Sequence, residues 1–356
     1  MVSGWPDTRL LELVGSELPI VQAPMANAGG VELCIGAIDG GALGSLPCGM
    51  LSPDQVREQV EAVRHATKGP LNLNFFCHSM PEAADDSSWK ALLEPYYQEF
   101  GVSSCPTAAL RQPFDESMSA VVEEIRPEVV SFHFGLPESK LMSRVKASGA
   151  VVLSSATTVD EARWLEERGA DAVIAQGFEA GGHSGRFLGN DPAEAMGLIA
   201  LLPQIVDAVR VPVVAAGGIG DGRGIAAAFA LGASGVQLGT AFLHCPESLL
   251  TLEQRQLLKD RATIFTNVYS GGLARALRGR LVDELGAVRA EVPPYPLGGR
   301  QIAPLLAASK KRGDFEFIPN LAGQAGPLGF PLPAEDLSRR LALQALAILR
   351  GEFQRH

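Results

Sequence analysis

The sequence predicts an α/β fold, a (β/α)8 TIM barrel, on three observations. Eight short apolar runs recur along the chain, helix-start signals lie between several of them, and polar residues or glycines follow most of them. Most runs are apolar throughout rather than alternating, which is typical of parallel strands buried on both faces. The predicted strands are Pro19–Ala23, Gly41–Leu46, Leu71–Phe75, Val129–Phe134, Val151–Ser154, Ala172–Ala175, Val211–Ala215 and Gly235–Leu238.

Helix signals separate these strands in the order that a barrel needs. Ser52-Pro53 opens one helix with a capping residue followed by a first-turn proline. Thr158 and Glu161 have the capping-box spacing, and the alanine-rich stretch Gly222–Leu231 predicts a short helix before the last strand. A barrel over roughly residues 15–245 follows. The alternative is a doubly wound open sheet, but no GxGxxG motif follows the first strand.

Two stretches do not fit the repeat. Residues 78–126 form an insertion after the third strand, and residues 246–356 follow the eighth. Helical patterns at Glu253–Arg261 and Leu337–Arg350 predict that the second stretch is mainly helical. We therefore expect a barrel at 1–245 and a smaller helical extension at 246–356 that contributes to the substrate pocket.

Composition excludes several classes of partner. Thirty Lys and Arg against 40 Asp and Glu give a net charge of −10, which disfavours nucleic acid binding. No apolar run approaches the roughly 18 residues of a membrane span, and Met1–Asp7 has no signal pattern. Five scattered cysteines without CxxC, and histidines without close ligand spacing, predict neither a disulfide framework nor a metal site. A cytoplasmic protein is expected.

Glycines follow the last two predicted strands. Gly217-Gly218 and Gly239-Thr240 stand where barrels commonly hold a phosphate, because glycine lets backbone N–H groups approach the phosphate oxygens. A helix N-terminus there would add partial positive charge. The alternative is that these glycines only form tight turns. Since no Walker pattern is present, the phosphate would belong to a small cofactor or substrate.

Three amide side chains end other strands. Asn74, Gln176 and Gln237 both donate and accept hydrogen bonds, which suits the edge of a flat heterocycle such as a flavin. The alternative is that they satisfy buried backbone groups.

Histidines lie at the same end of the predicted barrel. Glycines flank His183, so its imidazole can project into a pocket as a general base or electrostatic partner. His133 ends the fourth strand and is either a functional residue or a core residue. His78 follows the third strand closely enough to be a further candidate for the site. Glu179 is a general acid, a backbone-orienting group or a partner of Arg186.

Together these motifs resemble the nitronate monooxygenase family, which are FMN-dependent barrels, over nearly the whole chain. Asn267–Gly271 and Ala322–Gln324 resemble late family motifs. The element at Glu179–Gly185 is shared with FMN-dependent enoyl-ACP reductases, whereas Asn74–His78 and Ala322–Gln324 favour the bacterial type of nitronate monooxygenase. The barrel motifs that match are Gln22–Ala26, Asn74–His78, Gln176–Gly185, Ala215–Asp221 and Gln237–Thr240.

The resemblance implies roles for individual residues. His183 would be the active-site histidine, His133 a second pocket histidine and Tyr295 a substrate-pocket tyrosine, with Lys310 or Lys311 a weaker match to a pocket lysine. With Gly217 added from the phosphate argument, the expected FMN contacts are Pro24, Met25, Asn74, Gln176, Gly181, Gly217, Gly218, Gln237, Leu238, Gly239 and Thr240.

The implied activity is FMN-dependent oxidation of alkyl nitronates, such as propionate 3-nitronate, by O2 to a carbonyl product and nitrite. The expected partners are the small-molecule nitronate and O2, and the sequence leaves a homodimer open. The alternatives are an FMN-dependent enoyl-thioester reductase driven by NAD(P)H and a non-catalytic flavin- or phosphate-binding barrel. An IMP dehydrogenase type of reaction needs a loop cysteine after strand six, and Glu179–Gly185 contains none.

Overall fold

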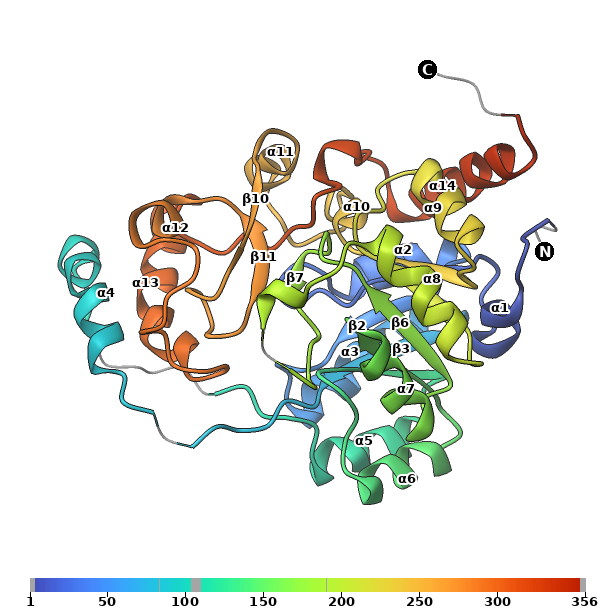
Figure 1. Ribbon diagram of the computed structural model, residues 1–356, viewed down its shortest axis with the longest axis horizontal. Coiled ribbons are helices and arrows are strands. Elements are labelled where there is room, and N and C mark those ends of the chain that lie inside the picture. The colour runs from blue at the N-terminus through green and yellow to red at the C-terminus, as the bar shows by residue number, and fades with distance from the viewer. Residues whose placement is uncertain (1–3, 83, 104–109, 190, 353–356) are drawn as a thin grey trace.

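Eight parallel strands form a ring in the computed structural model, which describes residues 4–82, 84–103, 110–189 and 191–352 (Figure 1). The strand order is β1-β9-β8-β6-β5-β4-β3-β2, and a parallel bridge between Val21 and Leu43 joins the two ends. The predicted (β/α)8 barrel is therefore confirmed, and each predicted run overlaps one strand. The strands are β1 (Ile20–Gln22), β2 (Gly44–Pro47), β3 (Leu71–Phe76), β4 (Val129–His133), β5 (Val151–Ala156), β6 (Ala172–Gln176), β8 (Val213–Ala216) and β9 (Gly235–Leu238).

Helices follow the strands and cover the outside of the ring. Ser52 caps α3 in a capping box, and the Thr158 side chain caps α7, as their sequences predict. The last helix, α14 (Ala334–Leu349), packs against α9 and α2 and so joins the outer layer. The helices that follow strands are α2 (Val31–Asp39), α3 (Pro53–Ala66), α5 (Glu116–Ile125), α6 (Ser139–Ala147), α7 (Val159–Glu167), α8 (Leu198–Ala208), α9 (Gly222–Ala230) and α10 (Thr240–Leu243).

The barrel interior is apolar at its lower end. Alternate residues of the strands, among them Val21, Leu153 and Val214, form one buried cluster with Leu10 and Val14. Those two side chains belong to α1 (Arg9–Val14), which closes the end of the ring opposite the strand C-termini. A site can therefore lie only at the other end of the ring, where the strands have their C-termini.

A second unit lies beside the barrel, at the left of Figure 1. We call α4 (Ser87–Phe100) together with residues 263–318 the cap, because one apolar cluster joins them. Strands β10 (Thr263–Thr266), β11 (Ala274–Leu277) and the short β7 (Gly182–His183) form its antiparallel sheet. The remaining helical elements are α11 (Leu252–Asp260), α12 (Arg280–Leu285), α13 (Gly298–Arg312), η1 (Pro192–Glu194) and η2 (Gly326–Leu328).

The insertion at 78–126 serves both units. Its α4 packs on α13 in the cap, whereas its α5 packs on α3 and α6 as an ordinary barrel helix. The chain returns from α4 beside β3, where the Phe114 N–H donates to the Phe76 carbonyl at 2.7 Å. The division at residue 245 stays a prediction, and helices form most of the regular structure beyond it, together with the unanticipated strands β10 and β11.

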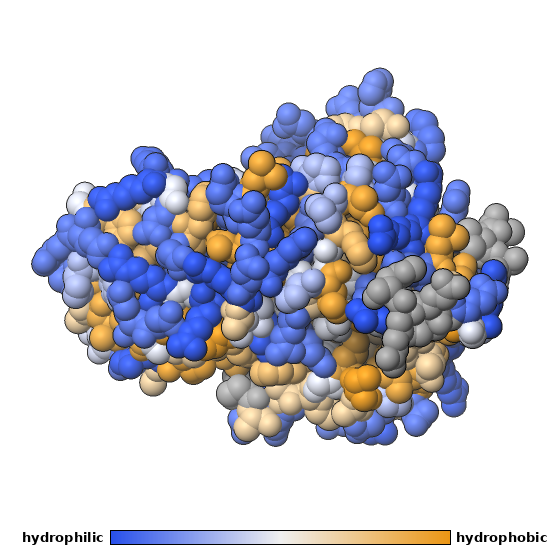
Figure 2. Space-filling model, turned by 90° about the horizontal axis from the view of Figure 1, so that it is seen from above, coloured by the Kyte–Doolittle hydropathy of each residue, from blue (hydrophilic) through white to orange (hydrophobic). Residues whose placement is uncertain are grey.

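Hydrophilic residues predominate on the face drawn in Figure 2, and apolar residues occur in smaller groups between them. Among the described residues, no helix has the length and apolar composition to cross a membrane. The homodimer and the cytoplasmic location stay predictions.

Leu10→Ala tests the closure of the barrel by α1. Leu10 is fully buried, so we expect the free energy of unfolding to fall by about 2–5 kcal/mol, while the opposite end of the barrel keeps its ligand affinity. Leu343→Ala is the control, because this side chain is 64% exposed and should cost less than about 0.5 kcal/mol. Urea unfolding measures both, and equal effects would contradict the packing described.

Candidate active site

The carboxyl ends of the barrel strands bring polar side chains together. The Asn74 amide nitrogen donates to the Ser131 hydroxyl at 3.0 Å and to the Ser131 carbonyl at 3.2 Å. Gln237 also lies at this end, and its side-chain oxygen is buried without a hydrogen-bond partner within the described protein. The interior therefore changes from apolar to polar toward the mouth, as the sequence predicts.

The loop after β6 is fixed by two of these side chains. The Gln176 amide nitrogen donates to the His183 carbonyl at 3.0 Å, and its oxygen accepts from the Gly185 N–H at 2.6 Å. His133 Nε2 lies 3.1 Å from the same His183 carbonyl, and His183 pairs with Ala274 of β11. Gln176 thus satisfies backbone groups, the alternative that the sequence left open, and its flavin contact stays a prediction.

His133 has a defined tautomer. A carbonyl oxygen only accepts, so His133 Nε2 carries the proton and Nδ1 accepts from the Ser155 hydroxyl at 3.2 Å. Burial lowers the pKa of His133 to about 4, and the hydrogen bond to the His183 backbone opposes this shift only in part. The ring is therefore neutral near pH 7.

His183 turns its ring into the mouth. Its Nε2 lies 2.8 Å from the Ser270 hydroxyl, and its ring centroid lies 5.1 Å from Tyr295 and 6.2 Å from Phe134. Burial holds the pKa of His183 well below its usual value, and the positive charge of Arg111 lowers it further, as do His133 and His78 when they are protonated. His183 is therefore also neutral at physiological pH.

A glycine-lined cradle adjoins the histidines. Gly217 and Gly218 have φ values of 109° and 69°, where side chains are strained, and a Cβ on Gly218 would lie 3.2 Å from the Glu179 side chain. A Cβ on Gly181 would collide with the Gly323 backbone. The Gly323 N–H donates to the Thr240 hydroxyl at 2.8 Å, so the loops after β6 and β9 meet the Ala322–Gln324 segment, and the loop after β8 packs on the loop after β6.

Carboxylate side chains engage the N-termini of two helices beside this cradle. The Asp221 side chain caps α9 through the Arg223 and Gly224 N–H groups. Both Glu179 oxygens accept from the Leu198 N–H, at 2.9 Å each, at the start of α8. Glu179 is therefore the backbone-orienting group among its three interpretations, and Arg186 pairs with Glu194 instead. The N-terminus of α9 is therefore occupied by its own carboxylate, whereas α10 begins at Thr240 with no side-chain cap from the described residues, so a helix contribution beside Gly239 stays a prediction.

Comparisons with known proteins now decide the family. The model of the nitronate monooxygenase family matches residues 7–343. This chain belongs to that family. A nitronate monooxygenase from Paraburkholderia phytofirmans is 40% identical over 344 residues, which is 93% of this chain and 93% of that protein. Another from Pseudomonas aeruginosa is 39% identical and covers 94% of this chain and 97% of its own length.

Solved structures agree with this family. The nitroalkane oxidase of Streptomyces ansochromogenes superposes with a TM-score of 0.89 at 36% identity, over 96% of this chain and 99% of that one. FabK from Thermotoga maritima has a TM-score of 0.75 at 28% identity, over 97% and 99% of the two chains. The family resemblance and the assignment as an enzyme of this family are confirmed.

The mouth of this nitronate monooxygenase family member contains groups that sequence reasoning did not single out. Phe134 has a φ of 67°, an unusual backbone conformation for a bulky residue that sets its ring against His133, 4.6 Å away. Ser270 appeared only as part of a motif. His78, left open before, joins the cluster with its ring 4.9 Å from Tyr295. Arg111 belongs to the insertion at 78–126, and no periodic pattern there indicates that its side chain reaches the barrel mouth.

Other expected residues lie elsewhere or remain untested. Lys310 and Lys311 are exposed in the last turn of α13, so the weaker match to a pocket lysine is wrong. Met25 packs beside Gly239, where an added Cβ would lie 3.6 Å from its sulfur. The roles of Pro24, Leu238 and the other residues named as FMN contacts stay predictions.

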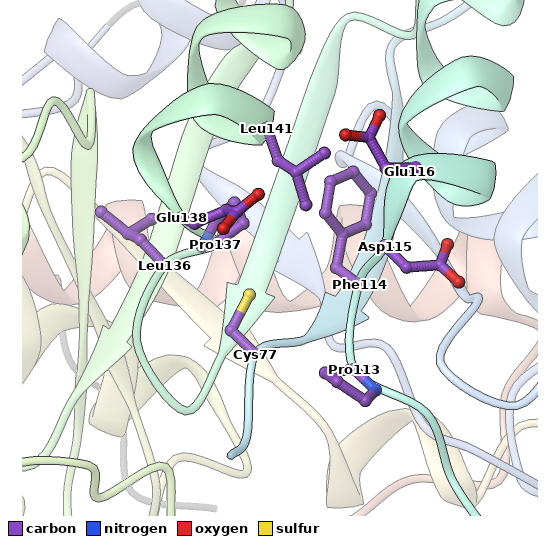
Figure 3. Close-up of a pocket in the computed structure, with 9 residues that line it drawn as sticks. All are labelled: Cys77, Pro113, Phe114, Asp115, Glu116, Leu136, Pro137, Glu138 and Leu141. Carbon is purple, nitrogen blue, oxygen red and sulfur yellow. The ribbon is translucent and has the colours of Figure 1, made fainter. Parts of the chain in front are cut away.

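A cavity of about 340 Å³ lies between the connections after β3 and β4 (Figure 3). The Cys77 thiol points into it, and burial raises the pKa of that thiol well above its usual value. Asp115 caps α5 and Glu116 pairs with Lys140, so these carboxylates are already engaged. We therefore place the chemistry at the histidines. The cavity is lined by Cys77, Pro113, Phe114, Asp115, Glu116, Leu136, Pro137, Glu138 and Leu141.

His133→Asn tests the burial of a neutral imidazole. The folded pKa of about 4 lies below the ordinary 6.5, so the unfolded chain binds the extra proton between these values. Stability from His133 is therefore present above pH 6.5 and is lost as the pH falls toward 4. We expect the pH dependence of urea unfolding to flatten in this window in His133→Asn. The exposed His65→Asn is the control, and an unchanged slope in His133→Asn would refute the assignment.

Proposed function

We propose that this protein oxidises alkyl nitronates with O2, using FMN, to a carbonyl product and nitrite. The single observation that carries the proposal is the juxtaposition of neutral His183 with the glycine cradle at one barrel mouth. Membership of the nitronate monooxygenase family supports it. The substrate is an anion, and the described side chains around His183 include Arg111 but no carboxylate.

The residues present fit FMN. The buried side-chain oxygen of Gln237 lacks a partner in the described protein, and it would meet a ring N–H of the flavin. Loops carrying Gly217-Gly218 and Gly239-Thr240 would hold the phosphate, with Gly181 close behind them. When bound, FMN supplies the electron acceptor for the nitronate and the site at which O2 is reduced.

The protein's own contribution follows from its neutral histidines. A base whose pKa is depressed is a poor acceptor for the α-proton of a nitroalkane. We therefore assign His183 to hydrogen bonding with the nitronate oxygens. In this role the protein binds the nitronate anion and does not remove the α-proton of a nitroalkane. Ser270 orients the ring at 2.8 Å, and the rings of Phe134 and Tyr295 exclude water around it.

One alternative keeps a specific observation in its favour. The Glu179–Gly185 element resembles that of FMN-dependent enoyl-ACP reductases, which supports an NAD(P)H-driven enoyl-thioester reductase as the alternative. The two functions differ in the electron donor, so one experiment separates them.

The purified, FMN-loaded protein is mixed anaerobically with propionate 3-nitronate while its visible absorbance is recorded. We expect rapid loss of the flavin absorbance, its return on admitting air, and nitrite in the solution. No change with nitronate, but rapid loss with NADH or NADPH, would replace the proposal by the reductase.

His183→Ala in the same experiment should keep its FMN and lose turnover by about 100-fold or more, because the group that holds the anion is gone. His65→Ala, at an exposed position on α3, serves as the control. Wild-type kinetics in His183→Ala would remove the role given to this ring.

Gly218→Ala tests the phosphate cradle. The substitution strains a residue with a φ of 69°, and it sets a methyl group against Glu179 at the cradle. We expect FMN affinity to fall about tenfold or more, measured by the quenching of flavin fluorescence on binding. Gly149→Ala is the matched control, because Gly149 has a φ of 91° with nothing within 4 Å and precedes β5 at the opposite end. Equal losses in both variants would show a general strain effect instead.

A further inference from the structure

Arg111 brings an uncompensated positive charge to the mouth. Its Nη1 donates to the Tyr295 hydroxyl at 3.4 Å, and its guanidinium carbon lies 5.7 Å from the Phe76 ring centroid. Over the ranges that the structure describes, no carboxylate pairs with Arg111. Lys310 and Lys311, which the resemblance offered as a pocket lysine, are exposed on α13 and do not supply this charge.

The backbone of Arg111 is held in place. Its carbonyl oxygen lies 3.2 Å from His78 Nε2, which therefore carries the proton, and the His78 ring packs on Tyr295 at 4.9 Å. The Phe114 N–H, a little further along, donates to the Phe76 carbonyl beside β3. The guanidinium thus projects from a segment anchored at both His78 and β3.

Tyr295 stands between Arg111 and His183. Its hydroxyl meets Arg111, while its ring centroid lies 5.1 Å from the His183 ring. The distance from His183 to the guanidinium is therefore about one tyrosine side chain. A substrate that reacts beside His183 can reach Arg111 with a group only a few carbon atoms from its reacting end.

The chemistry of these two groups favours a carboxylate. A guanidinium presents paired N–H donors in a plane that matches the two oxygens of a carboxylate. Burial raises the pKa of Tyr295, so the phenol keeps its proton at neutral pH. Because the Tyr295 oxygen accepts from Arg111, its proton is available to the same carboxylate.

We propose that Arg111, assisted by Tyr295, binds a carboxylate on the substrate remote from the nitronate carbon, and so makes Arg111 the residue that selects carboxylate-bearing nitronates. The nitronate end lies at His183, and the carboxylate end lies at the guanidinium. This assignment rests on the proposed function for its reacting end, but the carboxylate contact is measurable without turnover.

The kinetic test compares two nitronates of similar length, propionate 3-nitronate and butyl 1-nitronate. In Arg111→Met, kcat/KM for propionate 3-nitronate should fall, mainly through KM, at least about tenfold more than kcat/KM for butyl 1-nitronate, which loses only the general attraction of the positive charge. Arg111→Lys should restore part of the loss. Arg168→Met is the control, because that guanidinium also stacks on an aromatic ring, Trp164, but follows α7 at the opposite end of the barrel.

Equal losses for both nitronates in Arg111→Met, or no loss for either, would overturn the proposal. Flavin content and the unfolding midpoint, measured on each variant, separate a folding defect from a lost contact.

A binding experiment makes this proposal independent of turnover. Succinate matches propionate 3-nitronate in length and has a carboxylate in place of the nitronate, so it has two anionic ends, whereas butyrate has one. Calorimetry on the FMN-loaded protein should show succinate binding about tenfold or more tightly than butyrate, with the difference lost in Arg111→Met. The same preference in Arg111→Met would refute the assignment. Arg111-dependent succinate binding without any nitronate turnover would instead keep the assignment and remove the proposed function.

Discussion

The peptide carbonyl of His183 accepts hydrogen bonds from two different barrel strands, and the arrangement of the mouth depends on this point. Gln176 approaches it from β6 and His133 from β4, at 3.0 and 3.1 Å. The same residue pairs with Ala274 of the cap sheet. These contacts hold the His183 backbone from three directions, and the Ser270 hydroxyl, 2.8 Å from Nε2, sets the direction of the ring before any ligand arrives. Loops rarely provide such precision unless their backbone is fixed in this way.

Burial and charge have different effects at the barrel mouth. His133 and His183 are neutral because their rings are desolvated, so they offer hydrogen bonds rather than charge. The positive charge comes from Arg111, which donates to the Tyr295 hydroxyl, and the Phe134 ring packs on the Tyr295 ring. A pocket with this balance favours an anion over a neutral molecule. It does so although the chain as a whole carries a net charge of −10.

Local sequence signals predicted the parts of the molecule that depend on local physics. Each barrel strand is a short buried run, and the caps at Ser52 and Thr158 lie where side-chain chemistry places them. The places of residues that depend on contacts between segments far apart in the sequence were not predictable from local signals. Arg111 reaches the mouth because α4 packs on α13 and the chain returns beside β3, which no local pattern encodes. Strands β10 and β11 are short and form a separate sheet with β7, so no run of the barrel pattern includes them.

The central claim is that both mouth histidines are neutral, with His133 protonated on Nε2 and His183 fixed beside Ser270. The most direct measurement is nitrogen NMR of the FMN-loaded protein at pH 7 with labelled histidine, using His133→Asn and His183→Asn to assign the signals. We expect neutral-imidazole shifts for both rings, with the proton of His133 on Nε2. An imidazolium signal from either ring at pH 7, or a proton on Nδ1 of His133, would contradict the account.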